Sequence, residues 1–162
     1  MPLTTAQKIT LKAAIVANPT WSAFPLNGDG YLDLARLLST EIVAPAFVVW
    51  RTNVSTREVG EAMNSAEVAG LTTANTNRLV VMEAYSAGSF NASRADTRAG
   101  FDSVFSGAGG VLTRAALLLI YKRSATQIEK ILATGTGSDA LPATMGFEGA
   151  ISDVDVSAAR NS

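Results

Sequence analysis

The sequence lacks both cysteine and histidine. Without cysteine the chain has no disulfide framework and no thiolate metal site. Without histidine it lacks the commonest general base and the commonest metal ligand. A Ser-His-Asp triad and a zinc site with His or Cys ligands are therefore excluded within one chain, whereas chemistry that needs only carboxylates stays open.

Charge and long apolar runs are also scarce. Charged residues make up 17% of the 162 residues and the net charge is −1, which argues against broad attraction to nucleic acid or anionic membranes. The most apolar stretch, residues 115–121, is too short to span a bilayer, and lysines interrupt the N-terminal segment. We therefore expect a soluble protein with no membrane role.

What the sequence does contain is a series of helix signals. Thr4 with Gln7 and Ser55 with Glu58 have the spacing of capping boxes, in which two unpaired amide donors at a helix start are satisfied reciprocally. Further caps are expected near Thr72 and at Ser93. Helices are predicted over residues 4–17, 31–38, 56–64, 72–87 and 93–106, with a turn at 27–30 and an extended or connecting segment at 44–52.

The longest predicted helix follows the glycines at 109 and 110. Apolar or small residues recur every four positions from Leu112 to Leu132, and Gly135 ends the pattern. Ser124 and Gln127 have cap-like spacing, so a break near residue 123 is an alternative, but one continuous helix is favoured. The predicted fold is all-α: a bundle of five or six helices over residues 1–134, followed by a long extended C-terminal tail over 135–162.

The predicted tail differs in charge from the predicted bundle. Residues 1–133 carry 12 Lys/Arg and 10 Asp/Glu, whereas residues 134–162 carry one Arg and four Asp/Glu. Apolar residues in the tail alternate as in a strand, which favours a segment that covers a partner surface over a disordered end. The predicted partner-binding residues are Met145, Phe147, Glu148, Ile151, Val154, Val156 and Arg160.

No residue cluster predicts an enzyme. Glu58 is explained by capping, and Glu61 and Glu67 are interpreted as surface charges, so no catalytic, metal or cofactor site is expected. Residues 55–80 have the outline of a helix-turn-helix that carries Asn75, Asn77 and Arg78. Trp50 is interpreted as a core or interface anchor. The other candidate interface residues, for which a solvated helix surface is the favoured alternative to a basic face, are Arg94, Arg98, Lys122, Arg123 and Lys130.

Two segments carry a resemblance. PAFVVWRTNVSTREVGEAMN, residues 45–64, and TGTGSDALPATMGFEGAISDVDVSAARN, residues 134–161, resemble small structural proteins of tailed bacteriophages. In size and layout the chain is most similar to a head-to-tail adaptor, or connector, protein.

The resemblance implies a location and a set of partners. It implies a non-enzymatic ring of twelve subunits beneath the portal, in the virion neck, assembled in the host bacterial cytoplasm. The implied partners are the portal protein and the tail or nozzle proteins, with DNA passing through the channel without specific recognition. The alternatives are a helix-turn-helix-like DNA-binding packaging or regulatory protein, and another virion component such as a tail-completion or capsid-cement protein.

Overall fold

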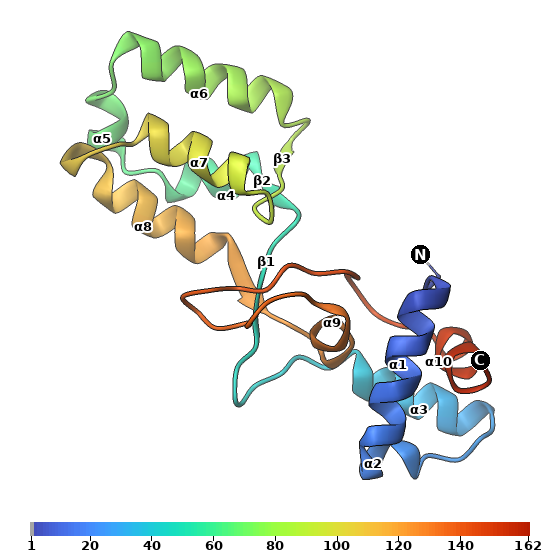
Figure 1. The fold of residues 1–162 in the computed structure, drawn as a ribbon. Coiled ribbons are helices and arrows are strands. Elements are labelled where there is room, and N and C mark those ends of the chain that lie inside the picture. Colours follow the sequence, from blue (N-terminus) through green and yellow to red (C-terminus); the bar gives the residue numbers. More distant parts are fainter. Residues whose placement is uncertain (1) are drawn as a thin grey trace. The chain divides into compact units, whose positions relative to one another are not determined.

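The structure, a computed structural model, describes residues 2–162. It is 56% helical, with ten α-helices in the described residues and sheets of only two strands each. This confirms a mostly helical protein, with more and shorter helices than the five or six predicted. The chain forms two compact units (Figure 1): within the described residues, unit 1 contains 2–49 and 124–162, and unit 2 contains 50–123. The boundary predicted at residue 134 therefore falls inside unit 1.

Unit 1 contains five helices from the two ends of the chain. They are α1 (Thr5–Ala17), α2 (Pro19–Ser22), α3 (Gly28–Leu38), α9 (Gln127–Leu132) and α10 (Asp153–Arg160). The predicted capping box at the start of α1 is confirmed, because Thr4 and Gln7 make both of its hydrogen bonds. Asn27 caps α3 by accepting from the Gly30 amide, so the segment predicted as a turn at 27–30 is instead the first turn of this helix.

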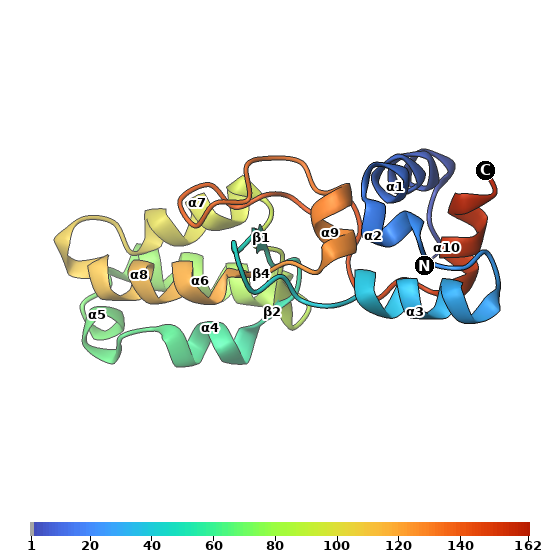
Figure 2. The ribbon, with the colours of Figure 1, turned by 90° about the horizontal axis from the view of Figure 1, so that it is seen from below.

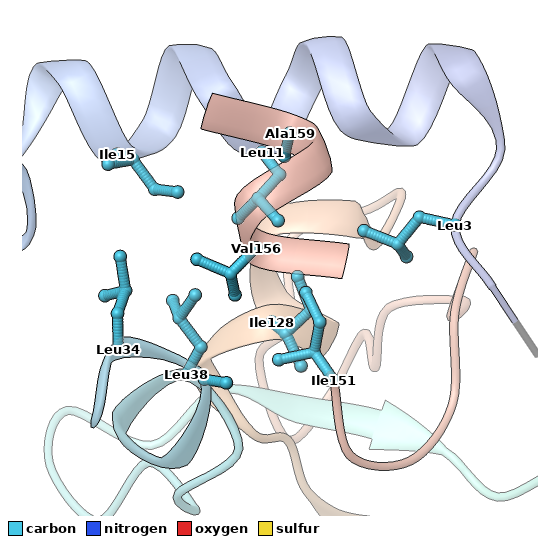
Figure 3. Packing of buried hydrophobic residues seen from close by; sticks show 10 residues of the cluster. Leu3, Leu11, Ile15, Leu34, Leu38, Ile128, Ile151, Val156 and Ala159 are labelled. Atoms are coloured by element: carbon cyan, nitrogen blue, oxygen red, sulfur yellow. The ribbon is translucent and has the colours of Figure 1, made fainter. Parts of the chain in front are cut away.

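The core of unit 1 joins these helices. Figures 1 and 2 show α10 beside α1 and α3, and these are the helices against which it packs. Figure 3 shows Ile151 and Val156 pointing toward apolar side chains of α1, α3 and α9. Val156 is fully buried and Ile151 is 5% exposed. The structure thus corrects the prediction of an extended tail: residues 151–160 complete the hydrophobic core of unit 1.

Hydrogen bonds also fasten this C-terminal segment to unit 1. The Leu3 amide donates to Asp155 Oδ1 at 3.1 Å, and the Ile151 amide donates to Ser39 Oγ at 3.1 Å. Ser152 caps α10 by accepting from the Asp155 amide, and the spacing of these two residues in the sequence is that of a possible cap for a short terminal helix. The ends of the chain are therefore held together within one unit.

Unit 2 is continuous in sequence. Its helices are α4 (Thr56–Ala62), α5 (Ser65–Ala69), α6 (Thr73–Tyr85), α7 (Ala95–Val104) and α8 (Val111–Ile120), with the 3₁₀ turn η1 (Ala108–Gly110) before α8. Strands β2 (Val54–Ser55) and β3 (Ser89–Phe90) pair antiparallel. The predicted capping box of Ser55 and Glu58 is confirmed. Val54, just before the cap, and Val59, in the helix, both lie in the core, which is the arrangement of a hydrophobic staple.

The core of unit 2 is aromatic. Phe101 meets Phe90 edge-on, with ring centroids 5.0 Å apart and planes at 78°, and its centroid lies 6.1 Å from that of Tyr121. Edge-to-face contacts of this kind place the positive rim of one ring against the negative face of the other. Helix α6 packs on α7, and α4 packs on α8, around this cluster.

The single long helix predicted over residues 112–132 is wrong. Helix α8 ends at Ile120, and residues Lys122–Ser124 form strand β4, which pairs with β1 (Val48–Trp50). A new helix, α9, then begins with a capping box made by Thr126 and Glu129. Two members of the four-residue series pack on different cores: Ile120 packs against the core of unit 2, and Ile128 lies in the core of unit 1.

Candidate interaction surface

Helix α8 is apolar on two opposite faces. Thr113 and Leu117 face the core and are at most 2% exposed. Because successive residues turn by about 100°, positions 1, 2, 5, 8 and 9 of the helix form one continuous stripe on the other side. That stripe, which we call the α8 outer face, consists of Val111, Leu112, Ala115, Leu118 and Leu119. Leu112 and Leu119 are 60% and 73% exposed.

The first turn of α8 is fixed by a carboxylate from α5. Glu67 accepts from the backbone amides of Leu112 at 2.9 Å and Thr113 at 2.7 Å. These amides have no partner within their own helix, so an acidic side chain there stabilises the helix start. Burial raises the pKa of Glu67, but the hydrogen bonds from Thr113 and Leu112 outweigh it and leave the pKa below its ordinary value. Glu67 is therefore a structural cap rather than the free surface charge predicted.

A groove of about 550 Å³ runs along one edge of the α8 outer face. Its walls combine apolar side chains of α8 with the end of α7 and the loop that follows, and they are lined by Asp102, Ser106, Gly107, Val111, Arg114, Ala115 and Leu118. The Arg114 guanidinium donates to the carbonyl oxygens of Phe105 and Gly107, which holds the loop against the helix. The groove is thus mainly apolar, with one fixed cation and one carboxylate on its walls.

A smaller pocket of about 120 Å³ shares Asp102, Arg114 and Leu118 with the groove. At its other end the Arg98 guanidinium stacks over the Trp50 ring, 4.0 Å from the centroid. The Tyr121 hydroxyl, which is buried, has no hydrogen-bond partner among the described residues. Burial raises the pKa of the Tyr121 hydroxyl, and the nearby Asp102 carboxylate raises it further. The hydroxyl therefore stays protonated.

Unit 1 has its own outward apolar side chains. Ile9 and Val16 lie two turns apart on α1 and are 60% and 70% exposed. Val16 also borders a pocket of about 260 Å³, lined by Lys12, Ile15, Val16, Ser22, Leu26 and Arg160. Both units therefore present apolar side chains to their surroundings.

The structure separates the seven predicted tail residues into buried and accessible ones. Ile151 and Val156 are core residues, so the prediction that they cover a partner is corrected for this folded state. Met145 and Phe147 are half-buried against two different core clusters. Of the other three, Val154, at 70% exposed, and Glu148 are accessible. Arg160 is held within unit 1, because its guanidinium donates to the Phe24 carbonyl at 3.0 Å.

The predicted basic residues do not form one helical face. Lys122 and Arg123 lie in strand β4, whereas Lys130 lies on α9 in unit 1, 5.6 Å from the centroid of the Phe47 ring. Trp50 and Arg98 contact each other in unit 2, as described above. Arg94 forms an ion pair with Asp96. The cap predicted at Ser93 is wrong, because the N-cap residue of α7 is Arg94, which makes no side-chain cap, and the Ser93 hydroxyl donates to Asn91 instead.

The segment predicted as a helix-turn-helix is divided into three helices, α4, α5 and the first part of α6. Asn75 Nδ2 donates to the Val104 carbonyl at 2.9 Å, and Arg78 Nη1 donates to Ser103 Oγ at 2.8 Å. Two of the side chains proposed to contact bases thus bind the end of α7 within their own unit.

Two features of the structure were missed by the sequence reasoning. The α8 outer face was not predicted, although the apolar residues of this segment occupy too much of the helix circumference to be buried on one side. Glu129, which is 1% exposed, caps α9 and accepts from the Gly149 amide at 3.1 Å. Its signal was the spacing of Thr126 and Glu129, which is a capping box beside the one proposed at Ser124.

Within residues 2–162 no three Asp or Glu side chains are grouped in a way that could hold a metal ion. No single helix in this range is long and apolar enough to cross a membrane; α7 together with η1 and α8 meets the length and composition criteria only as a pair bent by 117°. Comparisons with protein-family models, curated proteins and solved structures gave no match.

Proposed function

We propose that this chain is a structural protein of a tailed bacteriophage, a head-to-tail adaptor that forms a ring beneath the portal and links the capsid to the tail. The observation that carries the proposal is the α8 outer face, where Leu112, Leu118 and Leu119 are exposed side by side. Contiguous exposed apolar side chains mark surfaces that bind another protein, because leaving them in water is unfavourable. An assembly subunit requires such surfaces.

The second support is the distribution of apolar side chains over both units. A ring subunit contacts two neighbours and also the components above and below it, so it needs several surfaces rather than one. In unit 2 the α8 outer face is available, and in unit 1 Ile9, Val16 and Val154 are exposed. The proposed partners remain further copies of this chain in a ring of twelve, the portal protein, and tail or nozzle proteins.

The experiment is to locate the chain in the particle. A cryo-electron microscopy map of the virion that contains this protein should show a twelve-fold ring of it directly below the portal, in the neck. Particles made without the protein should accumulate as filled heads with no tail attached. Finding the chain on the capsid surface, inside the tail tube, or missing from purified virions would refute the adaptor assignment, and the first two outcomes would identify a cement or tail-completion protein.

The DNA-binding alternative has its own test. If residues 55–80 recognise duplex DNA, binding should weaken with salt and should fall when Arg78 is replaced by Ala. The contact of Arg78 with Ser103 does not favour this alternative, because it occupies part of the guanidinium within the unit. Absence of binding in a gel-shift assay at low salt would eliminate it.

A further inference from the structure

We infer that the α8 outer face and its groove in one copy of the chain bind the first turn of α10, around Asp153 and Val154, in the next copy. The inference rests on the proposed ring, and it adds the two surfaces that build it. The contact joins two different surfaces, so each copy uses one surface for each neighbour. Such head-to-tail contacts generate closed rings when the rotation between copies closes.

The charges of the two units support a second copy as the occupant. Unit 1 carries five Lys/Arg and eight Asp/Glu, a balance of −3, whereas unit 2 carries eight Lys/Arg and six Asp/Glu, a balance of +2. Contact between unit 2 of one copy and unit 1 of the next brings opposite charges together. Contact between two copies of unit 2 would bring like charges together, which disfavours a symmetric dimer through α8.

The groove itself requires an occupant with a particular combination of groups. Three charged side chains line the groove and the pocket beside it: Arg98, Arg114 and Asp102. Arg114 and Asp102 balance within the groove, and Arg98 in the adjoining pocket adds one positive charge, while the remaining wall along α8 is apolar. An apolar side chain flanked by a carboxylate fits this lining, because the side chain packs on α8 while the carboxylate approaches a guanidinium.

Val154 meets this requirement best among the exposed large apolar residues of unit 1. It is 70% exposed and is the only one of them that lies directly between two acidic residues in the sequence. The Asp155 carboxylate is bound by the Leu3 amide and Ser152, which fixes the turn, while Asp153 is exposed. The first turn of α10 is therefore a rigid, accessible projection with an apolar centre.

The absence of native cysteine allows a direct test by disulfide cross-linking. Ala115→Cys places a thiol in the groove, and Val154→Cys places one on α10. The two variants are mixed, oxidised mildly and separated on a non-reducing gel. We expect the mixed 115–154 dimer to dominate, and the double variant to form a ladder of higher oligomers. The matched control is Val43→Cys, because Val43 is 88% exposed in unit 1 but lies outside the proposed contact.

A second variant tests the apolar part of the contact without cysteine. Leu118→Asp puts a charge on the groove wall, and we expect it to weaken self-association by about tenfold or more in sedimentation velocity. Val80→Asp is the control, because Val80 is 58% exposed on α6, away from the groove. Circular dichroism identifies any variant that has lost its fold, and such a variant is replaced by Leu118→Ser.

The outcomes separate this inference from the proposed function. If rings form but the 115–154 cross-link is no more abundant than the cross-link to the Val43→Cys control, the assignment of these two surfaces is refuted. The adaptor proposal is then unaffected. Predominant 115–115 dimers would overturn the inference in favour of a symmetric contact. A chain that stays monomeric at every concentration also overturns it, and the position of the chain in the virion then decides the proposed function separately.

Discussion

Replacing Val156 by Ala should destabilise unit 1 far more than the same change at Val154, although the two residues lie on one helix. Val156 is fully buried in a core with side chains of α1 and α3, and Val154 is 70% exposed. Removing two buried carbon atoms costs about 1.6 kcal/mol in transfer free energy, and the cavity left behind brings the loss to about 2–3 kcal/mol. The change in helix propensity is the same at both positions, so it cancels in the comparison.

The assay is urea unfolding of unit 1 followed by tryptophan fluorescence. The chain has two tryptophans, Trp21 in unit 1 and Trp50 in unit 2, so a Trp50→Phe background leaves a reporter for unit 1 alone. With a slope of about 1–2 kcal/mol/M for a small unit, Val156→Ala should lower the midpoint by roughly 1–3 M. Val154→Ala should leave it nearly unchanged. Equal midpoints for the two variants would refute the packing of α10 into the core and would restore a detached tail.

Three further predictions concern unit 2, and each is checked by measuring the stability of a variant against that of the wild type. The hydrogen bond from Arg51, and after it those from Ser55, lower the pKa of Glu58 to about 2. The ionised Glu58 side chain therefore contributes its full stabilisation of the folded state above the unfolded pKa of about 4.5, and this stabilisation is lost as the pH falls toward 2. The stability difference between wild type and Glu58→Gln should shrink over that window, and a difference that stays constant from pH 6 to 2 contradicts this account. Gly110→Ala should strongly lower the melting temperature, because a Cβ there would lie 2.0 Å from the Phe105 carbonyl oxygen, whereas Gly109→Ala meets nothing within 4 Å and serves as the control. Equal melting temperatures for these two variants would count against the tight turn before α8. Tyr121→Phe removes a buried hydroxyl that has no partner among the described residues, so the free energy of unfolding of the isolated protein should stay the same or rise by up to about 1 kcal/mol. A clear fall in that free energy in urea unfolding would reveal a partner for the hydroxyl.

The sequence by itself determined the local starts of several helices. The capping boxes at Thr4 and Ser55 and the caps at Thr72 and Ser152 depend only on side chains within three residues of each other, and all four are present in the structure. The mostly helical composition followed from the same local signals. It also established that Cys and His chemistry is impossible in this chain.

Only the tertiary structure decided which apolar residues are covered. The four-residue spacing through residues 112–132 fits one long helix, but pairing of β4 with β1 satisfies the backbone of Lys122–Ser124 in another way and ends α8. Periodicity identifies an apolar face without naming its partner. Val156 was therefore assigned to a partner although it packs within unit 1, and Leu112 was placed on one apolar stripe with the residues around 128 although it is exposed, because burial depends on contacts between segments far apart in the sequence.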